Sequence, residues 1–236
     1  MNIRHSELKH AMVAQLDRNS VIANNLANVN SNGYKRDVMF SELIKSNDKS
    51  KSQNQLATDF SQGALIQTNN PLDLAISGEG FFTVDDGDQF AFTRDGHFSR
   101  GADGYLRSSS GLPVMGQAGW IDLGINGEAV ADIRVSMKGD VYVDDELIDR
   151  LEISSFDDQA KLNKIGANLY RADAGTYENR VEEPSILQGK IEGSNVQAVH
   201  EMVELIQLQR NFETAQKALR TLDDATSKAN SLGNYK

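Results

Sequence analysis

Two segments of this chain, one near each end, carry apolar or small residues at alternating spacings of four and three. Such a repeat averages about 3.5 residues, places one stripe along a helix and is typical of a coiled-coil seam. The C-terminal repeat consists of Leu208, Phe212, Ala215, Leu219, Leu222, Thr226 and Ala229. A second stripe lies upstream at Val196, Val199, Val203 and Ile206. We expect a long C-terminal helix with partners on more than one side.

The N-terminal segment has the same spacing, with two polar residues inside its stripe. Its positions are Leu8, Met12, Gln15, Asn19, Ile22, Leu26 and Val29. We predict a helix that ends at Asn32-Gly33, because glycine adopts the left-handed conformation at little steric cost. At the C-terminal helix, Ser194 and Gln197 have the spacing of a capping box. Neither helix can bury its stripe alone, so the two helices pair with each other or with other copies.

The sequence between the helices has a different pattern. The polar run from Ser46 to Gln55 indicates an exposed loop or linker. From Pro71 onward, short β-prone runs alternate with glycine and aspartate. Tight turns are expected at three dipeptides, Asp95-Gly96, Asp103-Gly104 and Lys138-Gly139.

These patterns predict an α+β fold in which the terminal helices form a coiled-coil-like domain and the middle of the chain is antiparallel β structure. The expected parts are a helical domain from residues 1–36 and 189–236, a polar linker or extended segment over 37–68 and a β domain over 69–188.

Charge is distributed unevenly over a chain whose formal net charge is −10. Residues 69–188 hold 22 acidic and 10 basic residues, whereas residues 189–236 hold 6 of each and residues 1–36 hold 2 acidic and 5 basic residues. The absence of a clustered basic region argues against a nucleic-acid partner. Nearly neutral ends can pack closely, while an acidic middle stays hydrated.

Other features of the sequence narrow the possible functions. No apolar stretch approaches the ~20 residues of a membrane helix, so we expect no membrane insertion. The first residues lack the apolar region of a secretory signal, which argues against Sec-type export. The chain has no cysteine, which excludes disulfides and thiolate metal sites.

Candidate catalytic and metal-binding patterns are weak. The four histidines, His5, His10, His97 and His200, have no second ligand or base at short spacing. The run Val84 to Asp88 is interpreted as a hairpin turn, not as a calcium loop. We expect no enzyme activity, catalytic residue, cofactor or metal. As alternatives, a β-domain hydrolase would need converging carboxylates, and a binding module would need an exposed aromatic platform.

Three phrases of this sequence resemble, in order, the signatures of the flagellar rod and hook family. They are ANNLANVNSNGYKR at Ala23–Arg36, NPLDLAISGEGFFTV at Asn70–Val84 and EGSNVQAVHEMVELIQLQRNFE at Glu192–Glu213. The resemblance covers nearly the whole chain. Two further phrases, Phe92–Arg100 and Ser109–Gly116, and the phrase IQLQRNFE at Ile206–Glu213 are more similar to the proximal-rod branch than to the distal-rod branch, which stays the alternative.

The resemblance implies a structural subunit of the periplasmic rod in the flagellar basal body, exported by the flagellar type III apparatus. Its implied partners are copies of itself and neighbouring rod proteins, joined by terminal helices that transmit torque during motility. Close apolar packing would make such contacts stiff. We therefore predict assembly-interface residues at Leu8, Met12, Ile22, Leu26, Val196, Val199, Val203, Ile206, Leu208, Phe212, Leu219 and Leu222. The family signature adds Asn24, Asn25, Asn28 and Gly33, whose amides could link neighbouring backbones.

Overall fold

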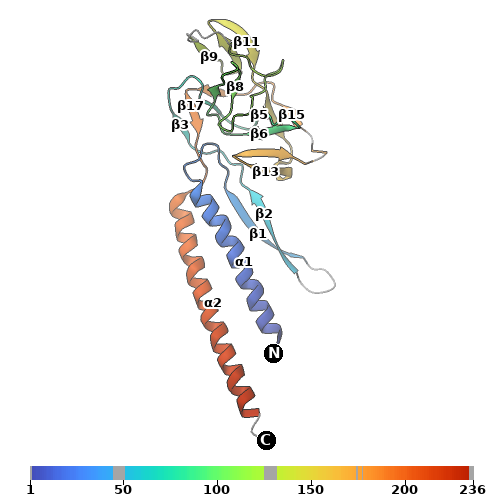
Figure 1. The fold of residues 1–236 in the computed structure, drawn as a ribbon, viewed down its shortest axis with the longest axis vertical. Coiled ribbons are helices and arrows are strands. Elements are labelled where there is room, and N and C mark those ends of the chain that lie inside the picture. The colour runs from blue at the N-terminus through green and yellow to red at the C-terminus, as the bar shows by residue number, and fades with distance from the viewer. Residues whose placement is uncertain (1, 45–50, 125–131, 174, 177, 234–236) are drawn as a thin grey trace. The chain divides into compact units, whose positions relative to one another are not determined.

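The computed structural model divides the chain into two compact units, each assembled from separated segments (Figure 1). It describes residues 2–44, 51–124, 132–173, 175–176 and 178–233. The first, here called the helical unit, contains residues 1–27, 37–57 and 197–236. The second, here called the β unit, contains residues 28–36 and 58–196. The signature segment around Gly33 and the residues just before the C-terminal helix therefore belong to the β unit.

The helical unit consists of two long helices and a strand pair. Helix α1 spans Asn2–Ala27 and helix α2 spans Ala198–Gly233. They run antiparallel, so that both chain ends lie at the same end of the pair (Figure 1). Strands β1 (Asp37–Ile44) and β2 (Lys51–Thr58) pair with each other. Residues 51–55, which we expected in an exposed loop, belong to β2, and residues 45–50 lie outside the described residues.

Both predicted helix boundaries need correction. Helix α1 ends at Ala27, before Asn32-Gly33, because the chain turns at Asn28. In this turn the backbone N–H of Ser31 donates to the Asn28 carbonyl, and the Ser31 hydroxyl donates to the Asn28 side-chain oxygen. Gly33 is nevertheless left-handed, with φ of 65°. Helix α2 begins at Ala198, and the Ser194 hydroxyl accepts the N–H of Val196 at 3.2 Å. Ser194 therefore forms a local turn before the helix, and the predicted capping box is wrong.

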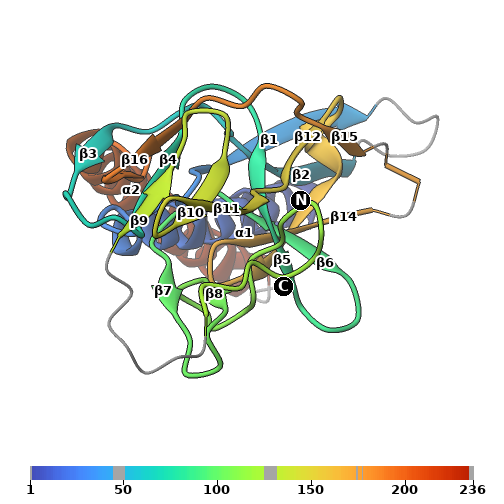
Figure 2. The ribbon, with the colours of Figure 1, turned by 90° about the horizontal axis from the view of Figure 1, so that it is seen from above.

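The β unit is built around a six-stranded antiparallel sheet in the order β13-β14-β6-β5-β12-β15. Its strands are β5 (Phe81–Asp85), β6 (Phe90–Thr93), β12 (Ile153–Phe156), β13 (Leu162–Gly166), β14 (Leu169–Ala172) and β15 (Glu178–Arg180), with a 3-10 helix, η1, at Gln159–Lys161. A three-stranded sheet in the order β11-β10-β9 joins β9 (Ile133–Val135), β10 (Asp140–Val143) and β11 (Glu146–Arg150) (Figure 2).

Three strand pairs complete the β unit. They are β3 (Leu65–Gln67) with β17 (Lys190–Glu192), β4 (Leu74–Ile76) with β16 (Ile186–Gln188), and β7 (Ser99–Arg100) with β8 (Leu106–Arg107). All three pairs are antiparallel. The fold is thus one N-terminal helix, one C-terminal helix and an antiparallel β middle, which confirms the α+β prediction at that level.

Glycines close the turns for two different reasons. Gly104 and Gly139 have φ of 87° and 86°, the left-handed geometry expected at their turns. Gly96 does not have a left-handed φ, in contrast to our expectation. A Cβ placed there would lie 1.6 Å from the carbonyl oxygen of Leu74, so Gly96 is required by the close approach of another backbone segment.

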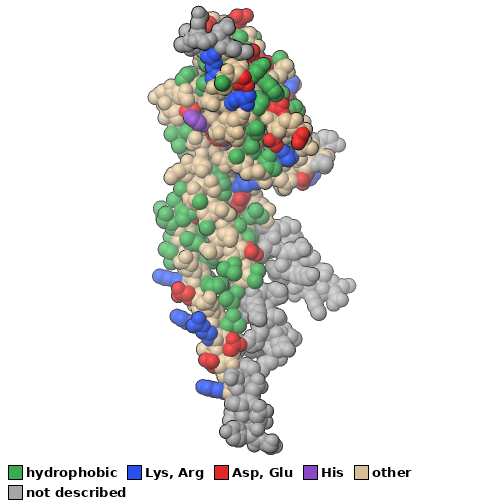
Figure 3. All heavy atoms as spheres, viewed as in Figure 1, with side chains coloured by type: hydrophobic (Ala, Val, Ile, Leu, Met, Phe, Trp, Pro, Cys, Tyr) green, Lys and Arg blue, Asp and Glu red, His purple; other side chains and the backbone are tan. Residues whose placement is uncertain are grey.

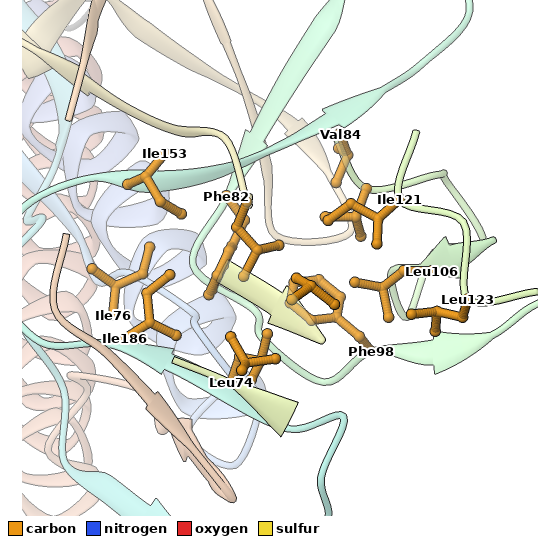
Figure 4. Packing of buried hydrophobic residues seen from close by; sticks show 14 of the residues in the cluster. Leu74, Ile76, Phe82, Val84, Phe98, Leu106, Ile121, Leu123, Ile153 and Ile186 are labelled. Atoms are coloured by element: carbon orange, nitrogen blue, oxygen red, sulfur yellow. The ribbon is translucent and has the colours of Figure 1, made fainter. Parts of the chain in front are cut away.

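Strand β5 separates two hydrophobic clusters. Successive side chains of a strand point to opposite faces. Phe82 accordingly belongs to the larger cluster, where its ring meets Phe98 edge-to-face at 5.0 Å (Figure 4). Phe81 belongs to the second cluster with Phe92, Phe156, Leu162 and Tyr170. Both faces of β5 are therefore buried. In the described part of the chain, no helix has the length and apolarity that crossing a membrane requires.

Candidate assembly surface

Part of the predicted interface packs inside the helical unit of a single chain. Ile22 on α1 and Leu208 on α2 are 3% and 9% exposed. The half-buried members of the prediction are Met12, Leu26, Phe212 and Leu219. The side chains of Leu8 and Leu222 lie outside the described residues. The stripe containing Leu208 therefore serves mainly to hold α2 on α1.

A different apolar stripe of α2 is open. Val199, Met202, Val203 and Ile206 are between 48% and 77% exposed, and their spacing places them on one face of the helix. On α1, Val13 and Leu16 are 55% and 50% exposed. We call the four residues of α2 the open apolar surface. Hydrophobic side chains are visible along the helices in Figure 3. Exposed apolar groups gathered in this way mark interaction sites in soluble proteins.

Val196 is not part of that stripe, although the sequence pattern placed it there. It precedes α2, belongs to the β unit and is 7% exposed. The 4,3 spacing thus continued by chance across the start of the helix. Val13, Leu16 and Met202 were missed, because a search for one seam ignores apolar residues at neighbouring positions on the helix.

Asn25 links backbones within its own chain. Its side chain donates to the carbonyl of Asp37 at 2.8 Å and accepts the Asp37 N–H at 2.9 Å. Its Nδ2 also lies 3.5 Å from a carboxylate oxygen of Glu201, which is fully buried. Asn25 therefore fastens the start of β1 to α1 and faces α2. Asn24, its neighbour in the signature, is exposed.

Three buried charges meet in the β unit. The Glu192 carboxylate accepts from Lys35 Nζ at 2.5 Å through Oε1 and from Arg94 Nη1 at 3.2 Å through Oε2. The side chains of Lys35, Arg94 and Glu192 are 0%, 4% and 1% exposed. Burial lowers the pKa of Lys35 and of Arg94 from their usual values, and the nearby carboxylate opposes that shift. We call this group the Glu192 cluster.

Backbone groups complete the surroundings of the Glu192 cluster. Gly63 donates its N–H to Oε1 of Glu192 at 2.8 Å, and Gly33 donates its N–H to the Glu192 carbonyl at 2.7 Å. A Cβ at Gly33 would lie 2.3 Å from the backbone nitrogen of Asp95. Gly33, which we predicted at an assembly interface, is thus a buried packing position inside the β unit.

Asn195 fastens the segments next to this cluster. Its Oδ1 accepts the N–H of Arg36 at 2.7 Å, and its Nδ2 donates to the carbonyls of Asp59 and Ser61 at 2.8 and 3.1 Å. The positions at which the chain leaves the β unit, next to residues 36 and 196, are therefore held together by one side chain.

In the β unit, His97 contacts two carboxylates, those of Asp73 and Asp95. His97 Nδ1 lies 2.7 Å from Asp73 Oδ1, a pair that short sequence spacing could not reveal. The Ser109 hydroxyl donates to Asp95 at 2.6 Å and not to the His97 ring, so these groups do not have the order of a Ser–His–Asp relay. Burial raises the pKa of Asp95, and the Ser109 hydroxyl and the His97 N–H oppose that shift. Among the described residues, no cluster of three or more potential ligands could hold a metal.

An aromatic pair with one exposed ring lies elsewhere on the β unit. Trp120 is 47% exposed, meets Tyr105 edge-to-face at 5.4 Å and donates Nε1 to Asp85 at 2.9 Å. The two rings line a shallow pocket of about 300 Å³ together with Ile148 and Asp149. This pair supplies one exposed ring of the aromatic platform that a binding module would need.

Comparison with known families matches three segments of the chain. Residues 9–35 match the family described as "Flagella basal body rod protein", residues 75–143 match "Flagellar hook protein FlgE/F/G D1 domain", and residues 187–232 match "Flagellar basal body rod FlgEFG protein C-terminal". The flagellar basal-body rod protein FlgF of Caulobacter vibrioides is 33% identical over 212 residues, which cover 84% of each chain. The chain belongs to the flagellar rod and hook family. Each charge of the Glu192 cluster lies in a different one of the three matched segments.

Relatives in the family carry two names. FlgG of Buchnera aphidicola subsp. Baizongia pistaciae is 32% identical over 249 residues, covering 93% of this chain and 95% of its own length. FlgF of Mesorhizobium japonicum is 30% identical over 235 residues, covering 93% of this chain and 92% of its own. The sequence identity of this chain to relatives named FlgF is therefore similar to its identity to relatives named FlgG.

Proposed function

We propose that this chain is a structural subunit of the flagellar basal-body rod and that it assembles through the open apolar surface of its helical unit. The observation that carries the proposal is the exposure of Val199, Met202, Val203 and Ile206 on one face of α2. Full burial of such a side chain from full exposure contributes about 1.5–3 kcal/mol. These four are between 48% and 77% exposed, so covering them contributes a corresponding part of that free energy each and favours association.

The proposed partners are copies of this chain and neighbouring rod proteins, and the proposed location is the rod of the basal body. The 4,3 spacing of Val199, Val203 and Ile206 suits knobs-into-holes packing, so we propose a coiled-coil-like contact between subunits. Export by the flagellar type III apparatus and a purely structural role without catalysis are part of the same proposal. Asn24, which is exposed on α1, is proposed as a polar contact at the edge of this surface.

Within the family we propose the proximal-rod protein FlgF as the counterpart, with FlgG as the alternative. The phrases Phe92–Arg100 and Ser109–Gly116 support this choice. Complementation decides between them: the gene for this chain should restore swimming to a strain that lacks FlgF and should not restore it to a strain that lacks FlgG. Rescue of the FlgG strain alone would reverse the assignment.

Two variants separate assembly from folding. Val203→Asp places a charge on the open apolar surface, so the purified chain should keep its helix content while cells that carry it as their sole copy build no complete rod. Leu208→Asp buries a charge between the helices, which costs several kcal/mol, and should reduce the helix content of the purified chain itself.

The measurements are circular dichroism of the purified chain, swimming, and electron microscopy of basal bodies. Asn211→Asp is the matched control, because it adds one negative charge to an exposed position of α2 outside the stripe. It should swim normally. Normal rods in the Val203→Asp strain would refute the proposed surface.

A binding role for the β unit is a second candidate, and Trp120 with Tyr105 favours it. The acidic character of residues 69–188 and the open indole face suit a basic side chain of a protein partner. Trp120→Ala should then impair swimming while basal-body rods stay intact. Normal swimming of this variant would remove the candidate.

A further inference from the structure

Strand β11 is an open edge of the three-stranded sheet. In the order β11-β10-β9 it pairs with β10, and no second strand of the described chain lies along Glu146–Ile148 (Figure 2). Leu147 and Ile148 are 56% and 39% exposed. An edge strand presents backbone donors and acceptors to which another chain can pair, and exposed apolar side chains on it favour such pairing. A further strand can therefore be added along this part of β11.

The other end of the same edge is already occupied, and a turn ends that contact. The backbone N–H of Gln117 donates to the carbonyl of Arg150 at 2.9 Å. The chain then reverses, because Gly116 donates its N–H to the Gly119 carbonyl at 2.6 Å and closes a tight turn. A segment added along Glu146–Ile148 would thus continue the line of residues 116 and 117, where the chain itself turns away.

A pocket of about 300 Å³ lies where the added segment would enter. Its walls include Ile148 and Asp149 from β11, together with Tyr105, Trp120 and Asp122. The indole of Trp120 is 47% exposed. Neither Asp122 nor Asp149 forms an ion pair with a cation in the part of the chain that the structure describes. An aromatic face beside carboxylates that lack a cation suits a lysine or arginine side chain.

The groups around the pocket are held in place by the fold. The Asp122 carboxylate accepts the N–H of Gly124 at 2.8 Å, and the Asp149 carboxylate accepts the N–H of Ala118 at 3.1 Å. The Trp120 ring is fixed by its hydrogen bond from Nε1 to Asp85. A site that is ordered before binding loses less entropy when it takes up a ligand.

We propose that Glu146–Ile148 and this pocket together bind an extended, basic segment of another protein. The segment pairs its backbone with β11, and one of its lysine or arginine side chains enters the pocket beside Trp120. The inference rests on the binding role proposed for the β unit and names the chemistry of the partner. The β unit of a second copy is a poor partner, because residues 69–188 hold 22 acidic and 10 basic residues and repel their like.

The first test follows Trp120, the single tryptophan of the chain, by fluorescence. The probe is a short peptide with blocked ends that alternates valine and arginine, and it should bind the purified whole chain with a dissociation constant of about 1 mM or below. Two control peptides should not bind: one carries glutamate in place of arginine, and the other has methylated backbone nitrogens that cannot donate to β11. No binding of the arginine peptide, or equal binding of either control, would overturn the inference.

Variants of one edge residue test the role of charge. Ile148→Lys should weaken binding of the arginine peptide about tenfold or more, because like charges then meet, whereas Ile148→Glu should bind at least as tightly as wild type. Ile165→Lys is the matched control, since this side chain is 40% exposed on β13 and lies outside the pocket. It should bind as wild type does. Equal affinities of the two Ile148 variants would overturn the inference.

The occupant is then identified in cells. A photoreactive benzophenone amino acid in place of Ile148 should attach another protein on illumination, and mass spectrometry should find lysine or arginine in the attached segment. The same amino acid in place of Ile165 should attach none. A product made of two copies of this chain, or an attached segment without a basic residue, would overturn the inference.

These failures are distinguishable from failure of the proposed function. If Trp120→Ala impairs swimming while the peptide does not bind, the binding role stands and pairing with a basic strand is wrong. Normal swimming of Trp120→Ala would remove the binding role and this inference with it. Assembly through the helical unit is decided separately by Val203→Asp.

Discussion

Replacing Glu192 by glutamine should destabilise the β unit far more than loss of one surface ion pair would. The side chain is 1% exposed, and its carboxylate faces two buried cations, Lys35 and Arg94. Glutamine has nearly the same shape, but it carries no charge, and its NH2 group must replace one acceptor. One cation then faces a donor, and both cations lose the only carboxylate with which they form an ion pair in the described part of the chain.

The magnitude follows from those contacts. Removing one partner of a buried ion pair costs about 3–5 kcal/mol, because the remaining charge stays desolvated. With a urea m-value of about 2 kcal/mol/M, a loss of about 4 kcal/mol lowers the unfolding midpoint by roughly 2 M. The single tryptophan of the chain, Trp120, lies in the β unit, so its fluorescence reports on this unit during urea unfolding.

Two comparisons make the test specific. Glu182→Gln removes an exposed carboxylate from the same unit and should change the free energy of unfolding by less than about 0.5 kcal/mol. Lys35→Met should cost less than Glu192→Gln, because it leaves one carboxylate facing one guanidinium. A free energy of unfolding for Glu192→Gln within about 1 kcal/mol of the wild-type value would refute the argument that this carboxylate neutralises buried cations.

Three further predictions concern the β unit and can be measured by urea unfolding. Gly96→Ala should destabilise it by several kcal/mol, because the new Cβ would lie 1.6 Å from the Leu74 carbonyl oxygen. Gly87→Ala, where φ is 90° but the space is open, should cost only about 1–2 kcal/mol. Similar losses for the two variants would contradict the steric reason. Asp95 has a raised pKa in the folded state, so it contributes stability that is fully present below the usual pKa of 3.8 and is lost as pH rises through the folded-state pKa. Asp95→Asn should remove this part of the pH dependence of the unfolding free energy. The same pH dependence in the variant and in wild type would show that Asp95 does not cause it. A fragment of residues 69–188 lacks β3, β17 and the buried carboxylate, so it should unfold at a lower urea concentration than the β unit of the whole chain, and equal midpoints would mean that these parts contribute nothing.

The sequence was sufficient to predict both helices and the β structure after Pro71, because helical and β periodicities are local properties. It did not predict strands β1 to β3, which lie in the predicted linker over 37–68. It placed the helices at the two ends, the antiparallel strands in the middle and the turns at Gly104 and Gly139. Helix ends were predicted less well, because a local hydrogen bond such as that from Val196 to Ser194 competes with a cap.

Pairing between distant segments could not be predicted from spacing. Nothing local to Lys35 indicates that Glu192 will lie 2.5 Å away, or that Gly33 packs against the backbone of Asp95. The periodicity of α2 also did not reveal which of its two stripes the same chain would cover. That choice depends on where α1 packs, and it assigned Leu208 to the interior and Val203 to the surface.

The hydrogen bonds of the Asn195 side chain have a consequence for the order of folding. Helices α1 and α2 are separated in sequence by the whole β unit, and closing a loop of roughly 170 residues in an unfolded chain costs about 4–5 kcal/mol of entropy by the logarithmic law. Once the β unit has formed, Asn195 bonds to the N–H of Arg36 at 2.7 Å and brings together the points from which the helical segments leave. The effective loop then shrinks to a few residues. We therefore expect two kinetic phases on refolding, with tryptophan fluorescence recovering before helical circular dichroism, and the helical phase should wait for the β unit in every molecule.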